Sequence, residues 1–258
     1  MIKLKTKEEI AILREGGKIL AEILATLKAM AVPGANTAEL EKKALALIKK
    51  ASGQPSFKGY AGSHNDKPYP SALCASINSE VVHAPSTPAR YLKNGDIICL
   101  DIGMRYKKLY TDTALTAPVG EIDAKAQKLI EVTQQCLELG IQQAKPGNKL
   151  LDIARAVQIN AEANGFGVVR ELVGHGVGYA VHEAPAVPNF YDSREEELEL
   201  ELKPGLVIAI EPMLTLGDWR VKTGADGFTI LTKDGSLAAH FEHTVAVTEE
   251  GNTVLTEK

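Results

Sequence analysis

The sequence is poor in cysteine, has no long apolar run and carries no excess of positive charge. Its three cysteines, Cys74, Cys99 and Cys136, are odd in number and lack zinc-knuckle spacing. A reduced, cytoplasmic chain is therefore expected. No apolar stretch approaches membrane-spanning length, and the charged first ten residues do not resemble a secretion signal. The net charge of −4 argues against a nucleic-acid partner.

Two patterns occur twice, in the same order and at nearly the same offset. Residues 92–101 (LKNGDIICLD) resemble residues 202–211 (LKPGLVIAIE). Upstream, AVPGANTAEL from Ala31 resembles AKPGNKLLDI from Ala144. The repeat predicts two similar halves related by a pseudo-twofold axis, each ending an apolar strand on a carboxylate.

Length and composition fit one globular domain. The 258 residues are 45% hydrophobic and 24% charged, which is ordinary for a globular chain with a sizeable core. We expect a single domain over residues 1–258, with internal half-repeats at about 31–117 and 144–248. The two halves should be interlocked rather than independent.

Capping signals and apolar periodicity predict four helices. Thr6 with Glu9, and Asn36 with Glu39, mark the first two starts, with the second helix running to about residue 50. Asp123 predicts a third helix reaching 144, and a fourth runs from about 149 to 164. Strands are expected at 72–82, 97–105, 109–117, 168–175, 206–214, 219–223, 228–232 and 239–248, with an inserted hairpin around 225–227 and a loop at 53–71. The sum is an α+β fold, with helices covering one face of a curved, mostly antiparallel sheet.

Four carboxylates interrupt apolar strands. Asp101 and Asp112 are equidistant from a turn centred at 106–107, so they should face each other, or nearly so, across a hairpin. Glu211 repeats the context of Asp101, and Glu242 occupies the place of Asp112 in the second half. A lone strand carboxylate usually faces solvent, but four in matching contexts favour a shared buried site. Buried like charges are costly unless a cation lies among them, so we expect metal.

Histidines complete the predicted site. His175 lies between glycines in GHGVG, where backbone and metal can approach closely, and is the expected fifth ligand. Such an oxygen-rich set suits manganese, iron, cobalt or zinc, and two ions about 3.5–4 Å apart can activate water at neutral pH. His83 and His182 are candidate donors to a substrate carbonyl or oxyanion, or are structural. The cases for His64, His240 and His243 are weaker, and His243 should point away from the face of Glu242.

With these residues in place, the chain resembles type I methionine aminopeptidase over essentially its whole length. The segments that carry the resemblance are SINSEVVH (76–83), GDIICLD (95–101), Asp112-Thr113, GFGVVRELVGHGVG (165–178), HEAP (182–185), LKPGLVIAIEPM (202–213) and EHTVAVT (242–248). The resemblance implies the pita-bread fold. It also implies removal of the initiator methionine from nascent polypeptides when the next residue is small, with possible transient ribosome association and a monomeric enzyme.

The same resemblance implies roles for individual residues. Asp101 chelates one divalent ion, and His175 and Glu211 hold the other. Asp112 and Glu242 bridge the two ions. Glu211 is expected to take a proton from the attacking water, while His83 and His182 flank the substrate. The positions matching the methionine side-chain pocket are Tyr69, Cys74 and Phe228, for which ordinary core packing is the alternative.

Three segments depart from the family pattern. The loop at 60–71 looks long, KLYTD replaces the usual lead-in to Asp112, and Val181 replaces an aromatic residue, which would widen the pocket. One alternative is an Xaa-Pro aminopeptidase or prolidase, which usually carries an extra N-terminal domain. Another is a non-catalytic peptide-binding module on the same fold, which typically lacks metal ligands, whereas all five ligand types are present here.

Overall fold

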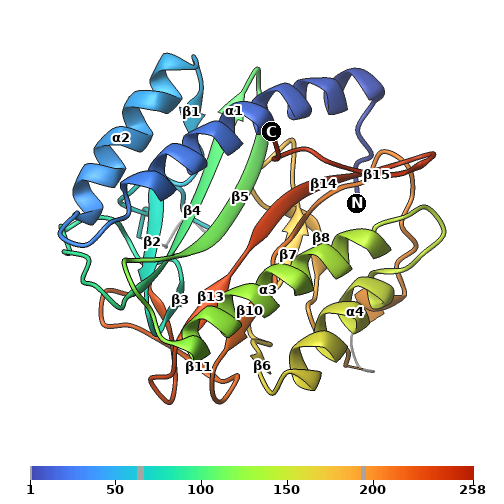
Figure 1. Ribbon diagram of the computed structural model, residues 1–258. Coiled ribbons are helices and arrows are strands. Elements are labelled where there is room, and N and C mark those ends of the chain that lie inside the picture. The colour runs from blue at the N-terminus through green and yellow to red at the C-terminus, as the bar shows by residue number, and fades with distance from the viewer. Residues whose placement is uncertain (1, 63–66, 193–195) are drawn as a thin grey trace.

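The computed structural model describes residues 2–62, 67–192 and 196–258. His64 and part of the 60–71 loop lie outside these ranges. Four helices cover one face of a large curved sheet, and two smaller sheets extend it at one end (Figure 1). Every strand pairing in the described ranges is antiparallel. The predicted fold class is confirmed.

The first three helices begin directly after their predicted capping residues, and the fourth begins near its predicted start at 149. They are α1 (Lys7–Met30), α2 (Thr37–Lys50), α3 (Ala124–Gln143) and α4 (Leu150–Ala163). Before α1, Thr6 Oγ1 accepts from the Glu9 N–H and the Glu9 carboxylate accepts from the Thr6 N–H, at 3.2 and 2.9 Å. Asp123 caps α3 by accepting two backbone N–H groups at 2.8 Å each. These bonds satisfy donors that the first turn of a helix leaves unpaired.

The large sheet has the order β1-β4-β5-β14-β9-β7-β8, with β2 also on β4 and β15 also on β14. The small sheets are β13-β10-β6 and β11-β12-β3. Their bounds are β1 Gln54–Pro55, β2 Leu73–Ile77, β3 Glu80–Val82, β4 Ile97–Tyr106, β5 Leu109–Pro118, β6 Gly167–Val168, β7 Gly174–Gly176, β8 Glu183–Val187, β9 Val207–Ile210, β10 Met213–Thr215, β11 Val221–Thr223, β12 Ile230–Thr232, β13 Ala238–His240, β14 Glu242–Thr248 and β15 Gly251–Val254. A short 3₁₀ helix spans Glu196–Glu199.

The strand predictions need correction in places. Four predicted strands are each two short ones, because turns or breaks interrupt them: 72–82, 168–175, 206–214 and 239–248. β1, β8 and β15 were not predicted. The hairpin around 225–227 is confirmed as β11–β12.

The turn between β4 and β5 lies one residue later than the sequence suggests. Lys107 and Lys108 both have positive φ, 46° and 76°, as a two-residue hairpin turn of right-handed twist requires. The register therefore pairs Asp101 with Ala114 and Asp112 with Gly103. The two aspartates are therefore not directly opposite each other; they nearly face each other, as diagonal neighbours on one face of the sheet.

Each helix pair packs on one half of the sheet. The first core cluster joins α1 and α2 to β2 and β4 through residues such as Leu20, Leu40 and Leu100. The second joins α3 and α4 to β9 and β14 through residues such as Leu137 and Ile208. The repeated upstream motif forms the turn inside each pair, where Gly34 and Gly147 adopt nearly the same φ, 88° and 87°. The two halves meet where β5 pairs with β14.

Candidate metal centre and substrate cavity

The five predicted metal ligands come from five adjacent strands. Asp101 lies on β4, Asp112 on β5, Glu242 on β14 and His175 on β7, while Glu211 directly follows β9. All five line one cavity of about 700 Å³. The site therefore forms across the seam between the halves, and each half supplies two of its four carboxylates.

Their ligand atoms form overlapping groups. Asp101, Asp112 and Glu242 offer atoms within 4.8 Å of one another, and so do His175, Glu211 and Glu242. Glu242 belongs to both groups. Asp112 also forms a group with His175 and His182, so it too belongs to two groups of candidate ligands. His175 Nε2 lies 3.5 Å from Glu211 Oε1. These groups could hold metal, and Asp112 and Glu242 each belong to two of them.

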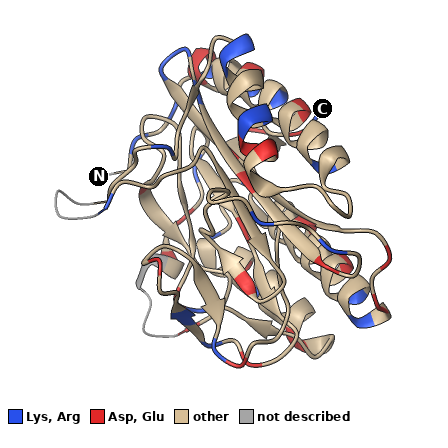
Figure 2. Ribbon diagram, turned by 90° about the vertical axis from the view of Figure 1, so that its left-hand side faces the viewer, with Lys and Arg blue, Asp and Glu red and all other residues tan. Residues whose placement is uncertain are grey.

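The four carboxyl groups lie in an environment that disfavours their ionised form. Burial, followed by the charge of Glu211, raises the pKa of Asp101 to about 8. Burial first, then neighbouring acids, raises the pKa values of Asp112, Glu211 and Glu242 well above the ordinary range. Figure 2 shows acidic residues on ribbons of the central sheet, while most lysines and arginines lie on helices and outer loops.

Two of these oxygens have no internal partner. Asp101 Oδ1 and Glu242 Oε1 are buried without a hydrogen bond to any described residue. A buried carboxylate oxygen without a hydrogen bond destabilises the folded state by on the order of 1–3 kcal/mol or more. Divalent cations among these oxygens would compensate them, so the donor set fits a metal centre.

His175 is oriented as a neutral ligand. Its Nδ1–H donates to the Gly176 carbonyl at 2.9 Å, which leaves the Nε2 lone pair directed to the carboxylates. Burial, and then His182, lowers its pKa to about 3. A Cβ at Gly174 would overlap the Ala209 carbonyl, and one at Gly176 would overlap the Ala184 carbonyl. The flanking glycines therefore let β7 lie tightly between β9 and β8.

Threonines fix the seam between the halves. The Asp112 N–H donates to Thr244 Oγ1 at 2.9 Å, and the Thr244 hydroxyl donates back to the Asp112 carbonyl at 2.7 Å. The Thr113 N–H donates to Asp112 Oδ1 at 3.0 Å, and its hydroxyl donates to the Glu242 carbonyl at 2.8 Å. Sequence reasoning missed these threonines, because a threonine in a strand carries no motif of its own.

His83 and His182 both line the cavity. The His182 ring lies edge-on to His175, with centroids 4.4 Å apart, and its Nδ1 lies 2.9 Å from the Tyr60 hydroxyl. Both side chains are open to the cavity but surrounded by protein, which lowers their pKa values; that of His83 falls to about 4, with a further contribution from His182. Both are therefore neutral at pH 7. His182 is also close enough to Asp112 and His175 to be a ligand, which is its alternative role.

The predicted pocket residues share one apolar cluster beside the acidic groups. Tyr69, Cys74 and Phe228 all line the cavity. The Tyr69 hydroxyl donates to Cys74 Sγ at 3.2 Å, and the Tyr69 and Phe228 rings meet edge-on, 5.5 Å between centroids. Phe57 and Val181 are buried in the same cluster. Phe57 and Tyr60 were not predicted, since the 53–71 segment offers only loop-forming composition.

Two remaining histidines are buried near the site. His240 is 1% exposed, with Nε2 3.6 Å from Glu211 Oε2 and Nδ1 3.6 Å from Cys99 Sγ. His243 bonds to Thr256 through Nδ1 at 2.9 Å, away from the cavity that Glu242 lines. The expectation that His243 and Glu242 point to opposite faces agrees with these contacts.

The chain is similar to known proteins over its whole length. The model of a family described as metallopeptidase family M24 matches residues 11–249. Methionine aminopeptidase 1 of Bacillus subtilis is 45% identical over 256 residues, which cover 99% of each chain. The methionine aminopeptidase of Aquifex aeolicus is 42% identical, again over 99% of each chain. The crystal structure of the Thermotoga maritima methionine aminopeptidase superimposes with a TM-score of 0.93 at 41% identity, covering both chains completely.

A more distant likeness concerns the fold alone. A prolidase from Pyrococcus horikoshii matches with a TM-score of 0.77 at 21% identity, and 63% of that chain is covered. Fold, site and close relatives thus define a pita-bread metallopeptidase. The chain belongs to metallopeptidase family M24 and, within it, to the methionine aminopeptidases.

Proposed function

We propose that this protein is a dinuclear-metal aminopeptidase that removes N-terminal methionine from nascent polypeptides when the next residue is small. The observation that carries the proposal is the meeting of five ligand side chains, two with unpaired buried oxygens, beside an apolar pocket. The names of the close relatives support the substrate. Residues 1–258 act as one catalytic domain built from the half-repeats 31–117 and 144–248.

The ligand geometry supports two divalent ions per chain, manganese, cobalt, iron or zinc. Asp101 would hold one ion, and His175 with Glu211 the other. Asp112 and Glu242 would bridge them, which explains why these two belong to ligand groups on both sides. When bound, the ions supply an activated water and polarise the scissile carbonyl.

The remaining roles in the reaction are assigned to individual side chains. Glu211 accepts a proton as water attacks and passes it to the leaving amine. His182, neutral and held at Nδ1 by Tyr60, donates through Nε2 to the carbonyl oxygen, on which negative charge develops. His83 contacts the substrate amide or amine. Tyr69, Cys74 and Phe228 surround the methionine side chain, whose thioether packs well against aromatic rings.

The proposal also covers the location of the protein, its oligomeric state and its partners. Of the helices in the described ranges, none combines the length and hydropathy that a membrane span demands. We propose a cytoplasmic monomer that meets its substrates at the ribosome, transiently. Nucleic acid and membrane are not expected partners.

Paired peptides test the function. The purified protein, loaded with Mn²⁺, Co²⁺ or Fe²⁺, should release methionine from Met-Ala-Ser and leave an Xaa-Pro peptide intact. Preference for the Xaa-Pro peptide would favour the prolidase alternative, and the absence of bound metal and of hydrolysis would favour a binding module. Met-Leu-Ser reports on pocket width: efficient cleavage would show that Val181 opens the site.

A further inference from the structure

The backbone at His83 is held in an uncommon conformation. Its φ is +60°, in the left-handed region that residues with a Cβ rarely adopt. Such a conformation persists only where the surrounding structure holds it, and it is common at functional sites. The contacts around residue 83 therefore bear on where its imidazole points in the cavity.

Both neighbours of His83 are fixed by sheet contacts. Val82 on its N-terminal side pairs with Ile230 of β12. On the C-terminal side, the Ala84 carbonyl accepts from the Ala75 N–H at 2.8 Å, and the Ala84 N–H donates to Ser76 Oγ at 3.4 Å. The second bond is long, so the segment after His83 depends on further support.

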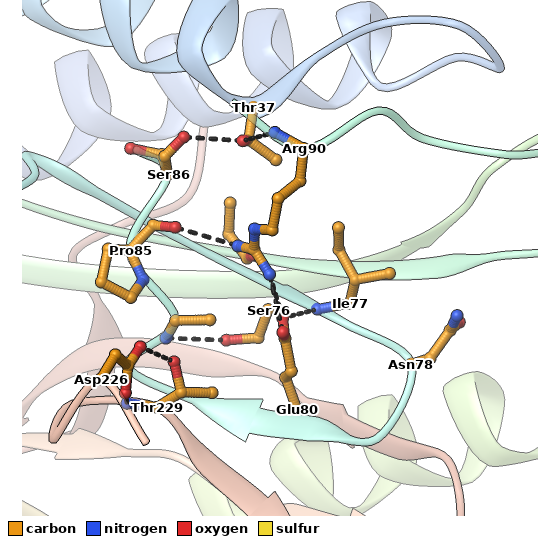
Figure 3. A network of polar contacts seen from close by, with 12 residues as sticks. Thr37, Ser76, Ile77, Asn78, Glu80, Pro85, Ser86, Arg90, Asp226 and Thr229 are labelled. Atoms are coloured by element: carbon orange, nitrogen blue, oxygen red, sulfur yellow. Dashed lines mark hydrogen bonds and ion pairs between the residues drawn. The ribbon is translucent and has the colours of Figure 1, made fainter. Parts of the chain in front are cut away.

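Arg90 supplies that support (Figure 3). One Nη donates to the Pro85 and Ala75 carbonyls at 2.9 and 2.6 Å. The other contacts both carboxylate oxygens of Glu80 at 2.7 and 2.6 Å. One planar group thus ties β2, the start of β3 and the residue two positions after His83. A lysine ammonium would not reproduce this fork.

The backbone of Arg90 is itself anchored. Its N–H donates to Thr37 Oγ1 at 3.0 Å, and its carbonyl accepts from the Thr37 N–H at 3.0 Å. The Thr37 hydroxyl donates to the Ser86 carbonyl at 2.6 Å. The first residue of α2 therefore fixes both the loop after His83 and the arginine that braces it.

We propose that Arg90 is a positioning residue for His83. By holding Pro85 and Ala75 against Glu80, its guanidinium sets the left-handed backbone that aims the imidazole into the cavity. Arg90 lies outside the set of residues that line the cavity, so it acts through His83 rather than on the substrate. This inference rests on the proposed function, in which His83 contacts the substrate.

A double-mutant cycle tests it. Arg90→Met should lower kcat/KM for Met-Ala-Ser by about 10- to 100-fold, the scale of a misplacement near 1 Å, with metal content unchanged. In a His83→Ala background, Arg90→Met should change kcat/KM less than about twofold. Arg90→Lys should restore less than half of the loss. Arg14→Met removes a comparable arginine, which donates to the Val254 and Glu257 carbonyls and, like them, does not line the cavity; this variant should match the wild type.

Several outcomes would overturn the proposal. These are wild-type kcat/KM in Arg90→Met, or the same fold-loss with and without His83. If Arg90→Met does not fold, Glu80→Gln, which removes the ion-pair partner, must show the same His83-dependent loss. The backbone provides a readout independent of activity: a crystal structure of the Arg90 variant should show residue 83 outside the left-handed region, and an unchanged φ contradicts the role of Arg90. If the wild type cleaves no methionyl peptide, the proposed function fails, while this structural comparison still decides on Arg90.

Discussion

At the scale of single residues, the two carboxylates that serve both ligand groups differ from the other three ligands. Asp112 and Glu242 are each 2% exposed, and burial first, then the charges of neighbouring acids, raises their pKa values. A cation between these two carboxylates would reduce their repulsion with the acids of both ligand groups. In the proposed arrangement, loss of either would disturb both ions, whereas loss of Asp101 would disturb one.

The first prediction follows from this difference. Asp112→Ala and Glu242→Ala should each lose most bound metal and nearly all peptidase activity, because a missing bridge frees both ions. Elemental analysis and hydrolysis of Met-Ala-Ser provide the measurements. Glu249→Ala, at an exposed acid just beyond β14, is the matched control and should keep both. Full activity in either bridge variant would show that the bridging assignment is wrong.

His182 gives a second prediction at the same scale. Its donor acts on charge that exists only in the transition state, so His182→Ala should lower kcat more than it raises KM. The loss should be about 10²–10³-fold, as for other single donors to an oxyanion. Steady-state kinetics with metal analysis checks this. Loss of metal would make His182 a ligand, and an unchanged kcat would make it structural.

At the scale of elements, helix starts were predictable and short strands were not. Thr6, Asn36 and Asp123 form their caps with residues two or three positions away, so local sequence contains the whole signal. β1 and β15 are two and four residues long, and β1 has no alternation to detect. Such strands are held by partners distant in sequence, and so they could not be predicted from their own residues.

The same reasoning applies to the site. The acidic residues were predicted because the repeat duplicates their context in both halves. Thr244 and Tyr60 were missed, and His240 was given only a weak case, because each acts through a contact across more than 100 residues of chain. The exact register of the β4–β5 hairpin also depended on backbone geometry at two lysines, which composition does not reveal.

β7 gives a prediction at this scale. Gly176→Ala places a methyl group against the Ala184 carbonyl, so β7 and β8 must separate and His175 must shift. Overpacking of this kind typically costs about 1–3 kcal/mol of stability. We expect weaker metal binding, by tenfold or more, measured by competition with a chelator. Gly140→Ala in α3 is the control, because its new methyl would meet side-chain methyl groups of Ile210 and Val157, 3.2 Å away, rather than a backbone carbonyl. Equal metal affinity in the two variants would contradict the packing argument.

At the scale of the whole molecule, the candidate metal ligands lie along the line where the two halves join. β4 and β5 carry ligands from one half, and β14, β9 and β7 carry those of the other. Threonine bonds cross the same seam, but β5 and β14 share only two paired positions, Glu242 with Ala114 and His243 with Thr113. Ions bound by all five side chains would therefore add cross-links at a seam that has few backbone pairs.

Chelation should for this reason destabilise the entire fold. The five ligands meet only in the native state, so the ions stabilise it by mass action, about 4 kcal/mol at a thousandfold excess over Kd. For a chain of this size each kcal/mol is worth about 2–4 °C, so Tm should fall by about 10 °C when metal is removed. Scanning calorimetry of the loaded and chelated protein measures the difference. The Glu242→Ala variant serves as control: with the shared ligand absent, its Tm should respond little to metal or chelator. If the wild-type Tm also does not change with metal or chelator, the acidic cluster holds no stabilising ion. The threonine hydrogen bonds and core packing alone would then stabilise the seam.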